Sequence, residues 1–155
     1  LALEAIHSQV VGWALSRSNF QQAIAEDLVQ QAYVELLTGK ARFDGESSLK
    51  TFMFSVVQNL ARNRYRRIAS RMRLLKTAGE EFGTVVVQPV EPGESSGVWE
   101  AVQELPRRQR DVVELMFCRD MTIEEASRVM GVSTGTGRVH YDRAKKALKG
   151  KLAND

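Results

Sequence analysis

The segment from Phe43 to Arg73 constrains this chain most, because a single helix in it must serve two different environments. In its first half, apolar residues recur at three- and four-residue spacing, which predicts a helix with one buried face: Leu49, Phe52, Met53, Val56, Val57 and Leu60. Its second half is basic and contains Arg62, Arg64, Arg66, Arg67, Arg71 and Arg73. Such a helix is suited to presenting positive charge to nucleic acid.

Charge is distributed unevenly along the chain, although the net charge is only +3. Ten bases and two acids lie between residues 40 and 76, and six bases and two acids lie between residues 131 and 155. Residues 77–98 contain four acids and no base. Two basic blocks separated by an acidic stretch indicate two nucleic-acid contacts. Solvated helix faces are the alternative, and two blocks at the ends of amphipathic helices make that alternative weaker.

The apolar periodicity predicts an all-α protein with two small helical domains. In the first domain we expect helices over residues 1–18 and 23–37 and from 49 through 73. In the second we expect a short helix from 98 to 105, then helices over 106–117, 123–130 and 134–148. Glycines, prolines and glutamates between them indicate a flexible acidic linker. The expected division is residues 1–76, linker 77–97 and residues 98–155.

The second domain has the pattern of a helix-turn-helix. Thr122 and Glu125 form a capping box, Gly131 makes the turn, and Ser133 caps the next helix, whose inner stripe includes Gly137. Its outward positions combine arginine, which can bind guanine, with aspartate, which can accept from cytosine: Arg138, Val139, Asp142, Arg143 and Lys146. Short helical hairpins need not bind DNA, so this pattern alone leaves the function open.

Aromatic residues near the arginines have two interpretations. A ring such as Tyr65 can stack on an unpaired base. Phe52 and Phe54 could do the same, but a place in the apolar core is favoured for both.

The residue types exclude several classes of protein. One cysteine, Cys118, cannot form an internal disulfide, and His7 and His140 have no evident partners, so no metal site, cofactor or catalytic constellation is expected. An enzyme is therefore the least favoured class. No apolar run approaches the ~20 residues of a membrane span, and no signal segment is evident. We expect a reduced cytoplasmic setting, and the start at Leu1 leaves a longer native N-terminus open.

Several blocks, in this order, resemble bacterial extracytoplasmic-function (ECF) sigma factors. Residues 25–31, 43–45 and 47–51, followed by Asn59 and Arg66-Arg67, look like sigma region 2. Residues 105–110 and 122–144 look like region 4. The resemblance covers most of the chain, with a linker in the expected place.

This resemblance implies a factor that binds core RNA polymerase and directs promoter-specific transcription initiation. It implies that region 2 reads the minus-ten element as melted single strand and that region 4 reads the minus-thirty-five element as duplex. The implied partners are the polymerase β′ clamp helices and β flap, promoter DNA and an anti-sigma factor.

The resemblance also implies three sets of contact residues. The clamp helices would be contacted by Asp27, Leu28, Gln30 and Gln31, on a polar face that composition alone would leave as solvated. Minus-ten DNA would be held by Phe43, Asp44, Gly45, Ser47, Asn59, Arg62, Arg66 and Arg67, with a flipped base between the 43–48 loop and Asn59. Minus-thirty-five DNA would be read by Arg138, Val139, Asp142, Arg143 and Lys146.

The chain departs from the family pattern at several positions. Gly137 stands where a buried valine is usual, and Tyr141, which replaces a usual leucine, is expected to fill the space. His140 replaces a frequent arginine, Gln31 a glutamate, Phe52 a tryptophan and Asn63 an aspartate. Promoter preference therefore cannot be copied from relatives.

Two other functions remain as alternatives. A sigma mimic that sequesters an anti-sigma factor would need the protein-binding faces but not the arginines. A conventional helix-turn-helix regulator would leave the block from Ala25 to Arg73 unexplained.

Overall fold

A computed structural model describes residues 2–77 and 97–153, and these residues form helices and connecting turns, as the periodicity predicts. The chain divides into two compact units, Leu1–Val90 and Glu91–Asp155. The predicted linker of residues 77–97 lies outside the described residues except at its two ends.

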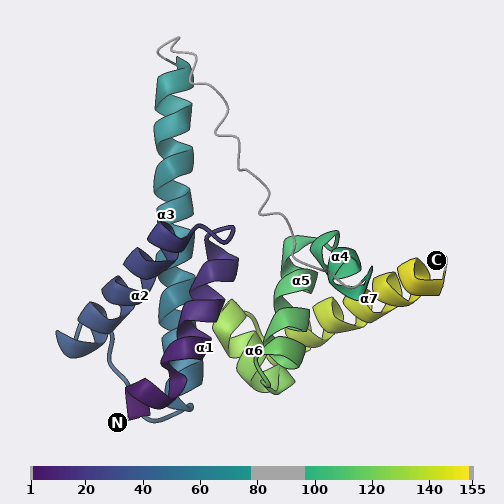
Figure 1. Ribbon diagram of the computed structural model, residues 1–155, viewed down its shortest axis with the longest axis horizontal. Helices are drawn as coiled ribbons and strands as arrows, with labels where there is room; N and C mark the ends of the chain where they lie inside the picture. Colours follow the sequence, from purple (N-terminus) through teal and green to yellow (C-terminus); the bar gives the residue numbers. More distant parts are fainter. Residues whose placement is uncertain (1, 78–96, 154–155) are drawn as a thin grey trace. The chain divides into compact units, whose positions relative to one another are not determined.

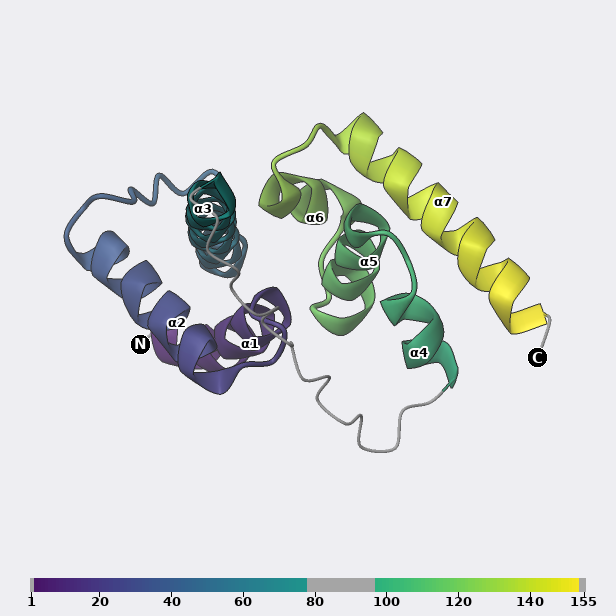
Figure 2. The same cartoon turned by 90° about the horizontal axis from the view of Figure 1, so that it is seen from above.

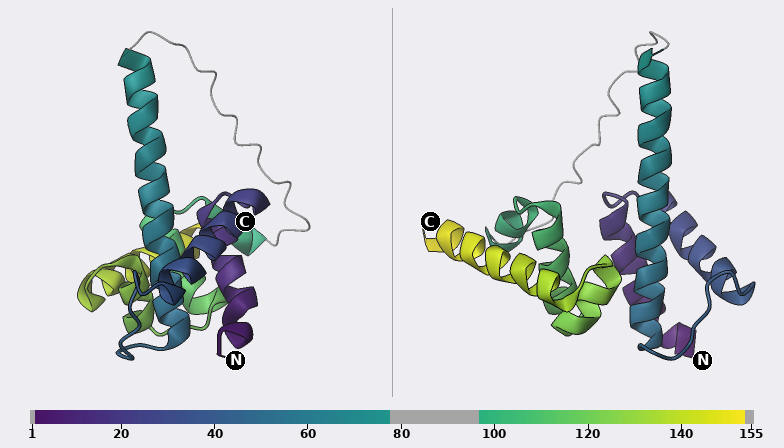
Figure 3. Two further views of the ribbon diagram at one scale, coloured as in Figure 1. Left: turned by 90° about the vertical axis from the view of Figure 1, so that its left-hand side faces the viewer. Right: turned by 180° about the vertical axis from the view of Figure 1, so that it is seen from behind.

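The first unit is a bundle of α1 (Ala2–Arg17), α2 (Gln22–Leu37) and α3 (Leu49–Thr77), each packed against the other two (Figures 1 and 2). All three predicted helices are confirmed within a few residues. At 29 residues, α3 is about 43 Å long, since an α-helix rises 1.5 Å per residue. Its C-terminal half therefore extends past α1 and α2 (Figure 3).

Trp13 and Phe54 form the centre of this bundle. Both side chains are fully buried, and their rings stack with centroids 5.6 Å apart and planes 4° from parallel. The indole Nε1 donates a hydrogen bond to the Phe54 carbonyl oxygen at 3.2 Å, which satisfies the one polar atom of the ring. The Arg17 guanidinium lies 4.0 Å from the indole ring centroid and adds a cation–π contact.

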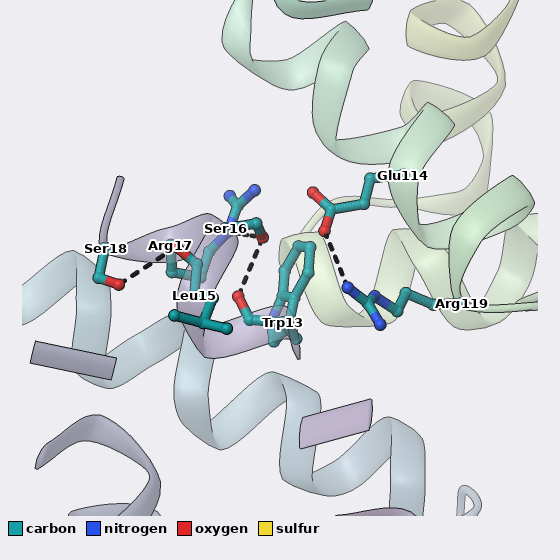
Figure 4. Close-up of polar contacts among 7 residues, drawn as sticks. All are labelled: Trp13, Leu15, Ser16, Arg17, Ser18, Glu114 and Arg119. Carbon is teal, nitrogen blue, oxygen red and sulfur yellow. Dashed lines mark hydrogen bonds and ion pairs between the residues drawn. The ribbon is translucent and has the colours of Figure 1, made fainter. Parts of the chain in front are cut away.

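The turn between α1 and α2 confirms the break expected between the first two predicted helices. Asn19 and Phe20 take φ values of 53° and 60°, a left-handed conformation that ends a right-handed helix. The Phe20 amide donates to the Leu15 carbonyl at 2.8 Å, and the Ser18 hydroxyl donates to the same carbonyl at 3.2 Å (Figure 4). These bonds satisfy a carbonyl at the end of α1.

The connection from α2 to α3 uses the residues that its turns require. Gly39, at φ +78°, ends α2 in a left-handed conformation, and Gly45 has φ +80°. The Asp44 Oδ1 accepts from the Glu46 amide at 3.0 Å. Ser48 caps α3, since its hydroxyl accepts from the Thr51 amide at 3.1 Å.

The second unit contains α4 (Gly97–Gln103), α5 (Arg107–Val113), the π-helical turn η1 (Glu114–Cys118), α6 (Ile123–Met130) and α7 (Thr134–Ala153). Helix α7 packs against α4, α5 and α6 (Figure 2). The capping box is confirmed: the Thr122 hydroxyl accepts from the Glu125 amide, and the Glu125 carboxylate accepts from the Thr122 amide, both at 3.2 Å. Gly131 ends α6 at φ 71°.

Two details of the second unit differ from expectation. Pro106 caps α5 from just outside the helix rather than occupying its first turn. The helix predicted through Phe117 changes into the π-helical turn η1, where the Arg119 amide donates to the Glu114 carbonyl at 3.1 Å. Glu114 is buried, and its carboxylate lies 3.7 Å from the Arg119 guanidinium (Figure 4). This ion pair holds the wider turn, and apolar spacing alone does not reveal it.

No helix among residues 2–77 and 97–153 is long and apolar enough to cross a membrane.

Trp13→Ala should destabilise the first unit by about 3–5 kcal/mol, because it removes a buried ring and its hydrogen bond. Urea unfolding monitored by helical circular dichroism should show an earlier transition for this unit. Trp99, in the second unit, should report an unchanged transition by fluorescence. Leu74→Ala, at a position 71% exposed, is the control and should shift neither transition. An unchanged first transition in Trp13→Ala would contradict this account of the core.

Candidate functional site

The outer face of α2 carries most of the residues predicted to contact polymerase. Asp27, Gln30 and Gln31 are exposed on this face. Leu28 is only 3% exposed, so it packs inside the bundle and is not available to a partner, contrary to its place in the predicted set. A leucine in the middle of a polar stretch can face either way, and only the packing of α2 on α1 and α3 decides this.

Two further apolar residues are exposed on α2, and the sequence pattern did not single them out. Val34 is 55% exposed and Leu37 is 78% exposed. They follow Asp27 and Gln30 by seven residues, or about two helical turns, so they lie on the same face. Large exposed apolar side chains beside polar ones are typical of a protein-binding surface. The seven-residue spacing was a signal in the sequence that could have identified them.

The loop between α2 and α3 places the first predicted minus-ten residues at the surface. Phe43 is 42% exposed, and its ring lies 5.3 Å from the ring of Phe52. Phe52 is therefore half-buried under the loop, whereas Phe54 is in the core, as favoured for it. Asn59 is exposed on α3. The Phe43–Phe52 contact attaches the loop to the helix that carries Asn59.

A cavity of about 440 Å³ lies between α2 and α3. It brings together residues from two predicted sets, because Gln31 lines it with Arg66 and Arg67. The remaining lining residues are Glu35, Lys40, Leu60 and Asn63. Asn59 and the 43–48 loop do not line this cavity, although the flipped-base pocket was expected between them. The cavity lies one helical turn further along α3, on Asn63.

The charges around this cavity favour an anion. Lys40, Arg66 and Arg67 contribute three cations, and the single carboxylate is Glu35. The Lys40 Nζ lies 3.6 Å from the Glu35 Oε1, so that carboxylate is partly neutralised. The remaining positive charge suits a phosphate or another anionic group.

In the second unit, the predicted duplex-reading residues all lie on the exposed face of α7: Arg138, Val139, Asp142, Arg143 and Lys146. The Arg138 guanidinium lies 3.5 Å from the Glu124 carboxylate at the start of α6. Asp142 pairs with Lys145 at 3.6 Å. Both pairs are solvent-exposed, so they are weak and can be exchanged for DNA contacts.

Gly137 is needed for the close approach of α6 and α7. A Cβ at this position would lie 1.9 Å from the Ser127 Oγ and 3.1 Å from the Ser127 Cβ. The space expected to be filled by Tyr141 is therefore filled by Ser127, which is 1% exposed. The Ser127 Oγ has no hydrogen-bond partner in the described part of the chain. The family pattern pointed to Tyr141, which replaces a usual leucine. A sequence does not show which neighbour approaches a glycine, so Ser127 was not identified.

Tyr141 instead belongs to a small aromatic patch. Its ring lies 6.2 Å from that of Phe117, which is 64% exposed at the end of η1. The Lys145 Nζ lies 4.6 Å from the Tyr141 ring centroid. The sequence predicts Phe117 only as the last residue of a helix, and the π-helical turn carries it to the surface.

The described residues contain no group of three His, Cys, Asp or Glu side chains that could hold a metal ion. Partial burial, followed by the charge of Glu114, raises the pKa of the Cys118 thiol. This thiol is therefore protonated at neutral pH, and a protonated thiol is a poor nucleophile.

Comparison with known families matches both units. The model for sigma-70 region 2 matches residues 3–71, and the model for sigma-70 region 4 matches residues 96–148.

Among curated proteins, the ECF RNA polymerase sigma factor EcfG of Rhodopseudomonas palustris (strain TIE-1) is 26% identical over 136 residues, covering 84% of this chain and 72% of that protein. The ECF RNA polymerase sigma factor SigX of Bacillus subtilis (strain 168) is 28% identical over 132 residues, covering 80% and 68%.

Solved structures share the fold. The sigma factor RpoE, in complex with the anti-sigma factor NepR from Bartonella quintana, has a TM-score of 0.68 at 24% identity and covers 99% of this chain and 95% of its own. CnrH, in complex with the cytosolic domain of CnrY, has a TM-score of 0.62 at 22% identity, covering 99% and 86%.

Gly137→Ala should destabilise the second unit, although alanine is usually better than glycine in a helix by about 1 kcal/mol. The reason is the contact with Ser127. Gly150→Ala is the matched control, because a Cβ at Gly150 meets nothing within 4 Å, and it should be neutral or stabilising. Thermal unfolding of both variants gives the comparison. Equal stabilisation by the two changes would show that α6 and α7 do not need the glycine.

Proposed function

The chain belongs to the sigma-70 family and is an ECF sigma factor that directs transcription initiation, and we propose how its surfaces divide that work. The first unit binds core RNA polymerase and melted minus-ten DNA. The second unit binds duplex minus-thirty-five DNA. The observation that carries this proposal is the single helix α3. Its first half packs apolar side chains inside the bundle, and every charged residue in the half that extends beyond the bundle is basic.

The polymerase-binding surface in this proposal is the outer face of α2. Asp27, Gln30 and Gln31 supply polar contacts to the β′ clamp helices, and Val34 and Leu37 supply exposed apolar area. Buried apolar side chains near the centre of an interface commonly carry much of its binding energy, while polar residues around them give orientation. Leu28 supports the surface from inside the bundle. The β flap is a further proposed contact, in the second unit.

Minus-ten DNA binds along the 43–48 loop and α3. The exposed rings of Phe43 and Tyr65 can stack on unpaired bases, and Arg62, Arg66 and Arg67 can neutralise phosphates. Asp44 and Gly45 shape the loop, and Ser47 and Asn59 are further proposed contacts. The cavity on Asn63 extends the proposed base pocket by one turn, because Arg66 and Arg67 line it and attract the phosphate next to a flipped base.

Minus-thirty-five DNA binds on the exposed face of α7. Arg138 and Arg143 can donate two hydrogen bonds to guanine, Asp142 can accept from cytosine, and Val139 can contact a thymine methyl group. Lys146 can neutralise a phosphate. The capping box on α6 and the close contact at Gly137 hold α6 and α7 rigidly, which helps base contacts to discriminate.

An anti-sigma factor is a further proposed partner. The sigma factor RpoE of Bartonella quintana has been solved with the anti-sigma factor NepR. A protein of this kind would bind the same exposed surfaces and keep the factor inactive until a signal releases it.

Run-off transcription with purified core polymerase across genomic fragments tests the proposed function. Initiation from a restricted set of promoters is expected when this chain is added. If the chain binds an anti-sigma protein but supports initiation from no fragment, it is a sigma mimic.

Arg138→Ala should relax selection at the minus-thirty-five element, at a cost of about 1–3 kcal/mol for the preferred base. Lys146→Ala, on the same helix but at a proposed phosphate contact, should weaken binding to all sequences about equally. Competition binding to duplexes that vary one base pair at a time separates the two effects. Unchanged promoter preference in Arg138→Ala would show that this face of α7 does not read bases.

Replacing Val34 and Leu37 together with alanine should weaken binding to core polymerase by at least about 1 kcal/mol, because exposed apolar area at the interface is lost. Val98→Ala is the matched control, at a side chain 52% exposed in the other unit, and should have little effect. Binding to immobilised core polymerase without DNA provides the measurement. If the double variant bound core polymerase as tightly as the parent chain, the polymerase contact would not include this end of α2.

A further inference from the structure

An apolar stripe continues along α3 from the bundle into the half of the helix that extends beyond it. Positions on this face recur at alternating spacings of four and three residues. Within the bundle they are Phe54, Gln58 and Ala61, which are 0%, 5% and 7% exposed. Beyond it they are Tyr65, Ile68 and Met72, which are 64%, 45% and 46% exposed, followed by the half-buried Leu75. This is the heptad spacing by which one helix packs against another.

The exposed part of this stripe lies outside the three-helix core. Within the first unit, α3 packs against α1 and α2, and Figure 3 shows its C-terminal half extending past both. Beyond Tyr65, which is shared with the proposed DNA contacts, the stripe lies on the side of α3 away from Asn63. At 100° per residue, Asn63 is about 180° around the helix from Phe54 and Met72. A partner on Ile68 and Met72 would therefore approach a different side of α3 from a DNA strand held at Asn63.

The residues that flank the stripe are basic. In heptad terms the flanking positions are Arg62, Arg64, Ala69, Arg71 and Lys76, and α3 contains no acidic residue between Leu49 and Thr77. Flanking charges set partner choice in paired helices. Because the flanking positions hold four cations and no anion, a partner helix with acidic residues at its own flanking positions would be attracted.

A hollow lies along the arginine-bearing edge of the stripe. It has a volume of about 210 Å³ and is lined by Ile68 together with Arg64, Arg67 and Arg71. Ile68, with three guanidinium groups beside it, fits an apolar side chain whose neighbours are carboxylates.

We propose that the Tyr65–Ile68–Met72–Leu75 stripe is a docking site for an acidic amphipathic helix of a partner protein. The partner's apolar side chains pack on the stripe, with one in the hollow at Ile68. Its glutamates or aspartates pair with Arg64 and Arg71 on one side and with Arg62 and Lys76 on the other. This is the mode in which an amphipathic helix binds a groove through apolar positions three and four residues apart.

Two other occupants fit these observations less well. A second copy of the chain would place arginines against arginines, because α3 has no acid to offer, and like charges across paired helices are destabilising. Nucleic acid would explain the arginines and Tyr65. It would not explain Ile68, Met72 and Leu75, which offer no aromatic face for a base to stack on.

Occupation of the stripe would affect DNA binding through Arg67. This residue lines both the hollow on the stripe and the cavity beside Asn63. An acidic helix that attracts Arg67 would withdraw it from the DNA strand. This regulatory consequence rests on the proposed function, whereas the docking itself does not.

Fluorescence anisotropy with the full chain tests the proposal. The probe is a designed, labelled peptide of about three heptads with isoleucine and leucine at the apolar positions and glutamate at the flanking positions. The peptide should bind, and replacing Ile68 and Met72 together with glutamine should weaken it at least about tenfold. Both positions are about half exposed, so the variant should fold. Val139→Gln, at the same 45% exposure as Ile68 but on α7, should leave peptide binding unchanged.

Three results would overturn the proposal. The first is equal peptide binding by the parent chain and the Ile68→Gln, Met72→Gln variant, or no binding by either. The second is equal binding of a matched peptide with lysine at the flanking positions. The third is a dimer in sedimentation experiments that the variant dissociates, which would make a second copy the occupant. Run-off transcription by the variant should persist without the peptide, so a failure of docking is distinguishable from a failure of the sigma-factor function.

Discussion

The contact between Trp13 and Phe54 is the interaction on which the first unit depends. The stacked rings and the bond from the indole Nε1 to the Phe54 carbonyl hold α3 against α1 in one rotation about its axis. Because α3 is a single helix, fixing the direction of Phe54 fixes every later side chain at 100° per residue. Asn63, Arg66 and Arg67 then point to the cavity beside α2, and Ile68 and Met72 lie on another side.

In the second unit, a buried contact between two helices also sets the direction of the exposed side chains, but this contact is much smaller. Gly137 lets α7 approach Ser127 so closely that a Cβ at this position would overlap the Ser127 Oγ unless that side chain moved. With Gly137 and Ala144 turned inward and buried, the side chains of Arg138, Val139 and Arg143 must point outward. In both units, buried contacts that touch no ligand decide where the exposed residues point. The rigidity of each exposed face therefore depends on the packing of the buried side chains beneath it.

The cavity between α2 and α3 brings together residues that are far apart in the sequence, and the sequence alone does not predict this. Gln31 was assigned to the polymerase surface, and Arg66 and Arg67 were assigned to DNA, yet all three line one cavity. Residues more than thirty positions apart meet there because α2 and α3 pack side by side. In contrast, the residues of the duplex-reading face are close in sequence and share one face of α7, so helical periodicity was enough to group them.

Local chemistry in the sequence determined the helices, their caps and the separation of charge along α3. Apolar spacing, the Thr122–Glu125 capping box and the left-handed glycines Gly39 and Gly131 act over a few residues, and their outcome can be predicted without the rest of the chain. Only the tertiary structure decided which side chains are accessible. It buried Leu28, exposed Val34, Leu37 and Phe117, and filled the space at Gly137 with Ser127 rather than Tyr141. The physical reason is that burial depends on contacts between helices, and a helix's own sequence specifies its apolar face but not the neighbour that covers it.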